Sequence, residues 1–193
     1  MERQNDIISL LTVKRFNVRL MTAYLQNNKQ RIGDFVVYSL ENETFSWRAS
    51  WVLCKYAEKN ATDIQPYAQM IAENLPNITK HGHIRETLKI LCHLQLDEKH
   101  TCDILDFCFK CVKDNKLQSS TKSAAFDFIL KVGQSYPELQ SEAQAIFSDT
   151  KDYYPHGMRK SIETRTKHAS SQAKIKTVRA SSHSKNEKII SQC

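Results

Sequence analysis

Residues 83–93 read "HIRETLKILCH", and residues 46–56 read "SWRASWVLCKY". In both stretches a cation follows an apolar residue near the start, and further apolar side chains recur at the spacing of one helix face. Arg48 and Arg85 stand 37 residues apart, and Lys122 and Arg159 continue the same interval. A motif that returns at a fixed interval of this size predicts a chain built from stacked helical units.

The sequence around these stretches also predicts helices. Only 4 Gly and 4 Pro occur among 193 residues, and the abundant Leu, Ala, Lys and Glu favour helix over turns. No stretch alternates as a half-buried strand would, so the predicted fold is all-α. Apolar period and breaks predict helices over residues 5–26, 29–42, 44–59, 62–74, 80–95, 98–114, 119–134, 137–149 and 155–168.

Two predicted helices fill each interval of the repeat. One helical hairpin cannot bury its apolar face alone, whereas stacked hairpins share a continuous core. The repeat itself is carried by pairs such as Trp47-Arg48 and Ile84-Arg85, an apolar residue and Arg at the start of a second helix. This pattern resembles that of HEAT-like and armadillo-like repeats over residues 29–168.

Four segments strengthen the resemblance: "WRASWVL", "RETLKIL", "CFKC" and "YPEL". They are similar to segments of a group of small bacterial HEAT-like proteins. The resemblance implies a right-handed α-α superhelix, that is, a HEAT-like solenoid of about four helical hairpins. It also implies that the second helix of each hairpin lines the concave face.

Charge is distributed unevenly along the chain. The formal net charge is +7, yet residues 1–158 hold 19 Lys and Arg against 19 Asp and Glu, and residues 159–193 hold 9 against 2. Residues 169–193 are rich in Ser and Lys and lack a sustained helical period, which predicts a disordered basic tail. The predicted domains are therefore a helical repeat domain over residues 1–168 and this tail.

Charge also differs between the two sets of helices. The helices that begin with the repeated cation have a positive excess, and the intervening helices a negative one. Placed on the concave face, the first set predicts a basic surface that attracts acidic partners. Alternatively, opposite charges of neighbouring helices pair along the rims, at about 0–1 kcal/mol each. The predicted partner-binding residues are Arg48, Lys55, Arg85, Lys89, Lys122 and Arg159.

Arg85 has a structural interpretation as well as a functional one. Its long side chain could reach an acidic or carbonyl group of the preceding repeat, near Asn77. In the functional interpretation it is one cation of the basic face. The two interpretations differ in whether loss of Arg85 affects stability or partner binding.

Trp47 and Trp51 are the only two tryptophans and share one helix face. They either pack between repeats or form the aromatic centre of a basic groove. The second arrangement resembles HEAT-like DNA glycosylases that remove alkylated bases, which place a carboxylate beside an exposed Trp. One turn after Trp51 this chain has Lys55 instead, which departs from that pattern.

The cysteines and the missing motifs bear on chemistry. Cys108 and Cys111 form the one Cys-x-x-Cys spacing, which could hold a metal or act as a redox pair. Polar residues of the same stretch fall on the opposite helix face, and no second such pair exists, so core cysteines are favoured. No glycine-rich phosphate loop, metalloprotease helix or nucleophile elbow occurs. The sequence predicts no catalytic residue, metal or cofactor.

The function predicted is a non-enzymatic helical-repeat module that binds an acidic protein or peptide. The alternative is a nucleic-acid-binding protein whose groove resembles that of DNA alkylation-repair proteins. No apolar run long enough to cross a membrane and no export signal occurs, so a cytoplasmic location and no membrane partner are expected.

Overall fold

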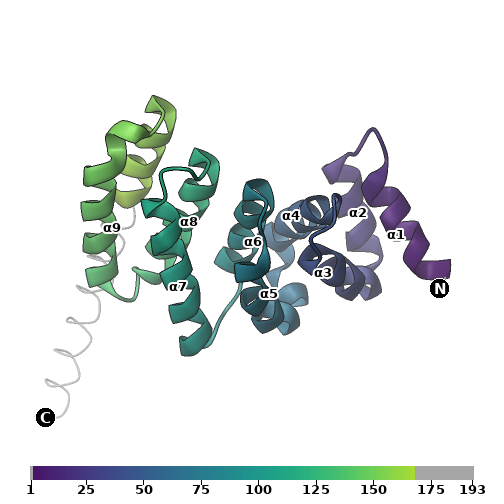
Figure 1. Cartoon of the computed structure of the whole chain (residues 1–193). Coiled ribbons are helices and arrows are strands. Elements are labelled where there is room, and N and C mark those ends of the chain that lie inside the picture. The colour runs from purple at the N-terminus through teal and green to yellow at the C-terminus, as the bar shows by residue number, and fades with distance from the viewer. Residues whose placement is uncertain (1, 168–193) are drawn as a thin grey trace, which may run out of the picture. The chain divides into compact units, whose positions relative to one another are not determined.

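The computed structural model of the chain describes residues 2–167 (Figure 1). Within these residues it holds nine numbered α-helices, a further helical segment over residues 156–167 and no strand, which confirms the all-α prediction. No helix in this range is both long and apolar enough to cross a membrane. The predicted tail, residues 169–193, lies outside the described residues. The helices are α1 Glu2–Thr12, α2 Val18–Asn27, α3 Ile32–Leu40, α4 Ser46–Ile64, α5 Ala68–Asn74, α6 His81–His93, α7 Glu98–Lys113, α8 Ser119–Val132 and α9 Pro137–Thr150.

The chain forms two compact units, residues 1–128 and residues 129–193, and the division falls within α8. In the first unit α2, α4 and α6 pack side by side and form one layer. A second layer is formed by α3, α5 and α7, with α3 against α4 and α5 against α6 (Figure 1).

The core of the first unit lies where these helices meet. Apolar residues at helical spacing give α4 and α6 one buried face each, and Leu53, Tyr56, Leu88 and Leu91 are fully buried there. Burying one such large side chain contributes about 1.5–3 kcal/mol to folding, so the two layers are held together mainly by apolar contacts. This is the shared core that stacked hairpins require.

The structure corrects the predicted helix over residues 5–26. The chain forms α1 and α2 with a connection between them, because Asn17 has an extended backbone and its side chain accepts the N–H groups of Arg19 and Leu20. Such an N-cap starts a new helix. The apolar period continues across the connection, which is why the sequence suggested one helix.

The break predicted after residue 59 is a kink rather than an end. Asn60 leaves the helical region of backbone angles, with φ −133° and ψ 39°, but α4 continues to Ile64. A 3-10 turn, Gln65–Tyr67, follows, and its Pro66 stands in the first turn. The next helix, α5, therefore begins at Ala68 and not near residue 62.

Polar side chains tie the connection after α3 to the one after α5. The Asn74 amide donates to the Leu40 carbonyl at 2.7 Å, and the Asn42 amide donates to the Asn77 carbonyl at 3.1 Å. Lys80, the residue before α6, donates to the Glu43 carbonyl at 3.2 Å. Carbonyl groups at helix ends have no partner in their own helix, so these contacts satisfy them and fix neighbouring repeats.

The second unit is described through residue 167. Pro137 opens α9, as predicted for a proline in a first helical turn. The buried Gln140 side chain donates to the Gly133 carbonyl at 2.8 Å, which joins α9 to the end of the preceding helix. Phe147 stacks on Tyr154 with ring centroids 5.9 Å apart. Ile162, in the helical segment 156–167, is fully buried.

Candidate protein-binding surface

Arg48, the first of the repeated cations, lies partly buried at the start of α4. Its Nη1 donates to the Leu11 carbonyl at 2.7 Å and to the Val13 carbonyl at 3.0 Å. The guanidinium also lies over the Phe16 ring, 5.0 Å from its centroid. Arg48 thus caps the end of α1, and its charge is used inside the fold.

Arg85 and Lys89, on α6, share one buried carboxylate. Glu86 Oε1 lies 2.7 Å from Arg85 Nε and 3.5 Å from Lys89 Nζ, and the Glu86 side chain is only 3% exposed. Arg85 Nη1 also donates to the Ser120 hydroxyl of α8 at 3.4 Å. The expected tie to the preceding repeat near Asn77 is therefore wrong for Arg85, which contacts the following repeat. Arg48 makes the backward contact instead.

The two other predicted cations of the first unit differ from each other. Lys55 is exposed on α4 and forms an ion pair with Glu58, one turn later. Lys122 is only 3% exposed, and burial lowers the pKa of its ammonium group. A buried ammonium cannot contact a partner, so the structure corrects the placement of Lys122 on the binding surface.

Arg159 belongs to the second unit. Its Nη1 lies 3.6 Å from Asp152 Oδ1, a contact between the helical segment 156–167 and the 3-10 turn Lys151–Tyr153. The repeated cation therefore has an ion-pair partner within its own unit. The five other predicted cations all belong to the first unit.

The two layers of the first unit differ in charge. Helices α2, α4 and α6 hold six Lys and Arg against three Asp and Glu, whereas α3, α5 and α7 hold three against five. The segregation follows the predicted sign for each set of helices. Most of the ion pairs in the described chain join residues three or four positions apart in sequence. The Lys29–Asp63 pair, at 2.9 Å, instead joins two different elements.

A further cluster of cations lies around the connection between α1 and α2. Between Asp6 and Asp34 the sequence has five Lys and Arg and no carboxylate. Lys29 pairs with Asp63 at 2.9 Å, and Arg31 pairs with Asp34 at 2.8 Å. The remaining three are exposed and form no ion pair with any residue that the structure describes; they are Lys14, Arg15 and Arg19.

Aromatic side chains lie beside these three cations. Trp47 stacks on Trp51 with centroids 5.9 Å apart and ring planes 19° apart, and Phe16 lies 6.0 Å from Trp51. All three rings are half-buried. Trp47 and Trp51 thus pack against the preceding repeat, as the packing interpretation predicted, and they keep an exposed part. We call Lys14, Arg15, Phe16, Arg19, Trp47 and Trp51 the N-terminal patch.

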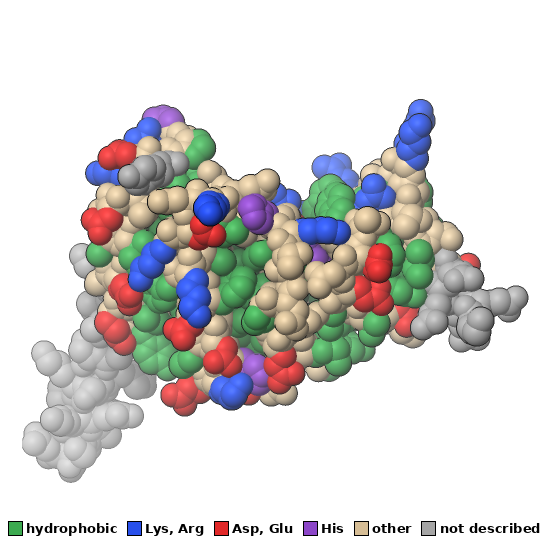
Figure 2. Space-filling model, in the orientation of Figure 1, with side chains coloured by type: hydrophobic (Ala, Val, Ile, Leu, Met, Phe, Trp, Pro, Cys, Tyr) green, Lys and Arg blue, Asp and Glu red, His purple; other side chains and the backbone are tan. Residues whose placement is uncertain are grey.

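Figure 2 shows this region on the surface. Around the connection between α1 and α2, at the upper right, Lys and Arg side chains stand next to a hydrophobic area. The prediction from the repeat did not include Lys14, Arg15 or Arg19, because none of them lies in a predicted helix that begins with the repeated cation. The signal that could have found them is the absence of any carboxylate from residue 7 to residue 33.

The cysteine pair lies in the core, as predicted. Cys108 and Cys111 are buried in α7, and burial raises the pKa of Cys108 well above its usual range and that of Cys111 to about 11. Burial, with the nearby Glu86 carboxylate, likewise raises the pKa of Cys54 to about 12. These thiols stay protonated near neutral pH, which suits packing rather than nucleophilic attack or metal binding.

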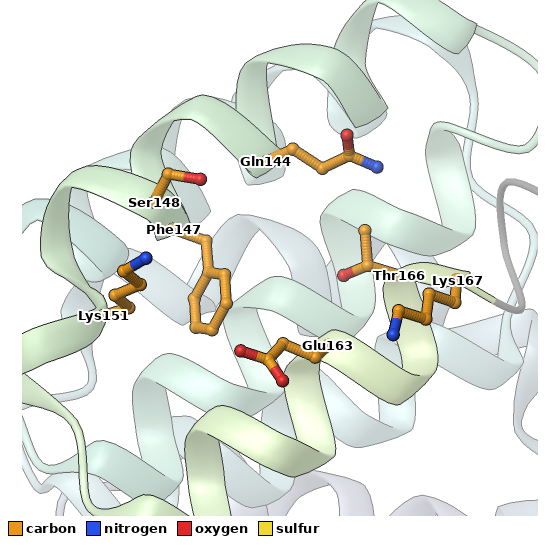
Figure 3. A pocket seen from close by; sticks show the side chains of 7 residues that line it. All are labelled: Gln144, Phe147, Ser148, Lys151, Glu163, Thr166 and Lys167. Atoms are coloured by element: carbon orange, nitrogen blue, oxygen red, sulfur yellow. The ribbon is translucent and has the colours of Figure 1, made fainter.

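The second unit has an open pocket of about 630 Å³, a volume that falls in the range of small-molecule sites (Figure 3). The Phe147 ring lies between Lys151 on one side and Glu163 on the other. Lys167, which also lines it, is the last described residue.

Comparison with known proteins agrees with the fold. Residues 10–169 match the family of the HEAT repeat domain, which is more than half of the chain. The chain belongs to the HEAT repeat domain family. No curated protein and no solved structure shows significant similarity to it.

Proposed function

We propose that this chain is a non-enzymatic protein-interaction module that binds an acidic protein or peptide through the α2–α4–α6 layer. The observation that carries the proposal is the pair of cations on one buried carboxylate, Arg85 and Lys89 on Glu86. One carboxylate neutralises one of the two cations, so the surface keeps a positive charge. The buried Glu86 also holds both side chains in place, which reduces the entropy that a partner must remove on binding.

The rest of the layer supports an acidic partner. Its helices have twice as many Lys and Arg as Asp and Glu, six against three. Lys55 and Lys89 are 45% and 42% exposed, so both can contact a carboxylate of the partner. Exposed charges of this kind raise the rate of association and make binding weaken with salt.

The alternative function, nucleic-acid binding at a groove centred on the tryptophans, is less well supported. Base stacking needs an aromatic ring face that is open to the base. Trp47 and Trp51 instead stack on each other, and Phe16 lies against Trp51. One turn after Trp51 stands Lys55 and not a carboxylate. We therefore favour a protein partner.

The proposal can be tested by affinity capture with the full chain as bait. Wild type is compared at about 50 mM and about 300 mM salt with a Lys55→Gln/Lys89→Gln variant. The matched control is Lys99→Gln/Lys110→Gln, two exposed lysines of α7 in the other layer. We expect an acidic protein that wild type and control retain at low salt and that the first variant releases.

Two results would contradict the proposal. One is that wild type retains no protein at low salt. The other is that a retained protein binds the Lys55→Gln/Lys89→Gln variant as well as it binds wild type, because the α2–α4–α6 layer would then not be the surface used. Thermal melts of all three chains check that each remains folded.

A further inference from the structure

The N-terminal patch has charge that the fold does not use. Lys14, Arg15 and Arg19 are exposed and have no ion pair among the described residues, whereas Lys29 and Arg31 of the same acid-free stretch are both paired. Three neighbouring cations without a carboxylate repel one another, which raises the free energy of the protein when no partner is bound. A polyanionic partner relieves that repulsion, so the patch is complementary to negative charge.

The aromatic part of the patch favours carboxylates over bases. The Trp47 ring contacts Trp51 and the guanidinium of Arg48, which lies 5.6 Å from its centroid. The Phe16 ring likewise contacts Trp51 and Arg48. These contacts occupy ring faces on which a base would otherwise stack. Aromatic edges carry partial positive charge, which suits an acidic side chain rather than a stacked base.

Exposed apolar side chains flank the cations. Val13, directly before Lys14, is 38% exposed, and Leu20, directly after Arg19, is 69% exposed. Large apolar side chains at this degree of exposure in the described chain are few, and these two border the same patch. A partner that covered only the cations would leave them in water. A partner with an apolar side chain beside its carboxylates would bury them and gain their transfer free energy.

We propose that the N-terminal patch is a docking site for an acidic peptide segment of a protein partner that carries an apolar side chain next to its carboxylates. The inference rests on the proposed function in taking the partner to be an acidic protein. It adds the chemistry of the segment that docks and a site distinct from Lys55 and Lys89. The two proposals therefore predict different effects of different variants.

The test uses the full chain and synthetic probes. The main probe is a fluorescein-labelled peptide of alternating Glu and Leu, compared with a Glu-Ser peptide of equal length and with single-stranded oligothymidylate of equal charge. Binding is measured by fluorescence anisotropy at about 50 mM salt. Trp47 and Trp51 are the only tryptophans of the chain, so their emission, measured with an unlabelled peptide, reports directly on occupation of the patch.

The patch variant is Arg15→Glu/Arg19→Glu, and the control variant is Lys99→Gln/Lys110→Gln on α7. A third variant, Lys55→Gln/Lys89→Gln, separates the patch from the surface of the proposed function. We expect the Glu-Leu peptide to bind wild type, to shift the tryptophan emission, and to bind the patch variant about tenfold more weakly, since two exposed charges are reversed. The control variant should bind within about twofold of wild type. If the patch variant does not fold, Lys14→Gln/Arg15→Gln takes its place.

Several outcomes would overturn the inference. Equal binding of the peptide by wild type and patch variant would place the site elsewhere. Loss only in the Lys55→Gln/Lys89→Gln variant would leave the proposed function standing without the patch. Equal affinity for the Glu-Ser peptide would remove the apolar requirement. Tighter binding of oligothymidylate, lost in the patch variant, would make the patch a nucleic-acid site. No binding of the Glu-Leu peptide to wild type would also sink the inference, while the capture experiment would still decide the proposed function.

Discussion

Arg48 and Arg15 lie near each other in the first unit but play different parts in it. The Arg48 guanidinium donates hydrogen bonds to two carbonyl groups at the end of α1, at 2.7 and 3.0 Å. Arg15 is exposed and has no ion pair among the described residues. The comparison extends to their groups: the repeated cations of the first unit contact the fold or are buried in it, whereas those of the N-terminal patch do not. The regularly spaced cations of the first unit therefore contact the fold, whereas Lys14, Arg15 and Arg19, which lie outside the interval, form no ion pair among the described residues.

The largest expected difference in stability comes from removing one arginine of each group. Arg48→Ala should lower the free energy of unfolding by about 2–3 kcal/mol, because hydrogen bonds from a charged group to two helix-end carbonyls are lost. Arg15→Ala should change it by less than about 0.5 kcal/mol, as for other exposed positions. Urea unfolding followed by circular dichroism measures both. Equal losses would abolish the distinction between the two groups.

The two cations on Glu86, Arg85 and Lys89, should also differ. Arg85→Ala should destabilise the fold by about 1–2 kcal/mol, since it removes a short contact to the buried Glu86 and leaves that carboxylate with one cation. Lys89→Ala should have less than half that effect, because its contact is longer, at 3.5 Å, and its side chain is 42% exposed. Chemical denaturation of the two variants ranks them. The reverse order would mean that Lys89 is the main partner of Glu86.

The free energy of unfolding should depend on pH through a buried residue of the repeats and not through the N-terminal patch. His83 is buried on α6 with its Nε2 2.7 Å from the Ser39 carbonyl, and burial lowers its pKa. Below about pH 6.5 the unfolded chain binds a proton that the folded chain refuses, so the free energy of unfolding falls. His83→Gln should make that fall shallower, as measured by melts between pH 7.5 and about pH 5.5.

The control for this experiment is Arg15→Ala, which should follow wild type at every pH. His100 acts in the opposite sense, because the hydrogen bonds that its protonated ring donates to Asp97 and to Glu73 raise its pKa. Its contribution is present at low pH and is lost as pH rises through the raised pKa. A slope that His83→Gln leaves unchanged would exclude His83 as the source.

The smallest expected effect is a gain in stability. Arg15→Gln/Arg19→Gln should stabilise the fold by a few tenths of a kcal/mol at low salt, because cations without a carboxylate nearby repel one another. The gain should vanish at about 0.5 M salt, where the repulsion is screened. Calorimetric melts at the two salt concentrations measure it. A loss of stability instead would show that these arginines serve the fold, as Arg48 does.

Much of the architecture could be predicted from the sequence, and the reasons are local. The 37-residue interval and the apolar period were enough for stacked helical pairs, because both reflect which faces must be buried. The start of α2 could not be placed, since it depends on one Asn17 side chain inside a continuous apolar pattern. The site was predicted less well. The repeat picked out Lys122, which is buried, and passed over Lys14, Arg15 and Arg19.

The sequence by itself determined the class of fold, the charge difference between the two sets of helices and the burial of Cys108 and Cys111. These follow from composition and from period, which act along one helix at a time. Only the tertiary structure decided which cations are used inside the fold. Arg48 reaches carbonyls 35 and 37 residues away, and Arg85 and Lys89 meet over a carboxylate whose burial depends on the neighbouring helix. A charge is free or engaged according to what packs against it, and packing is set by elements distant in the chain.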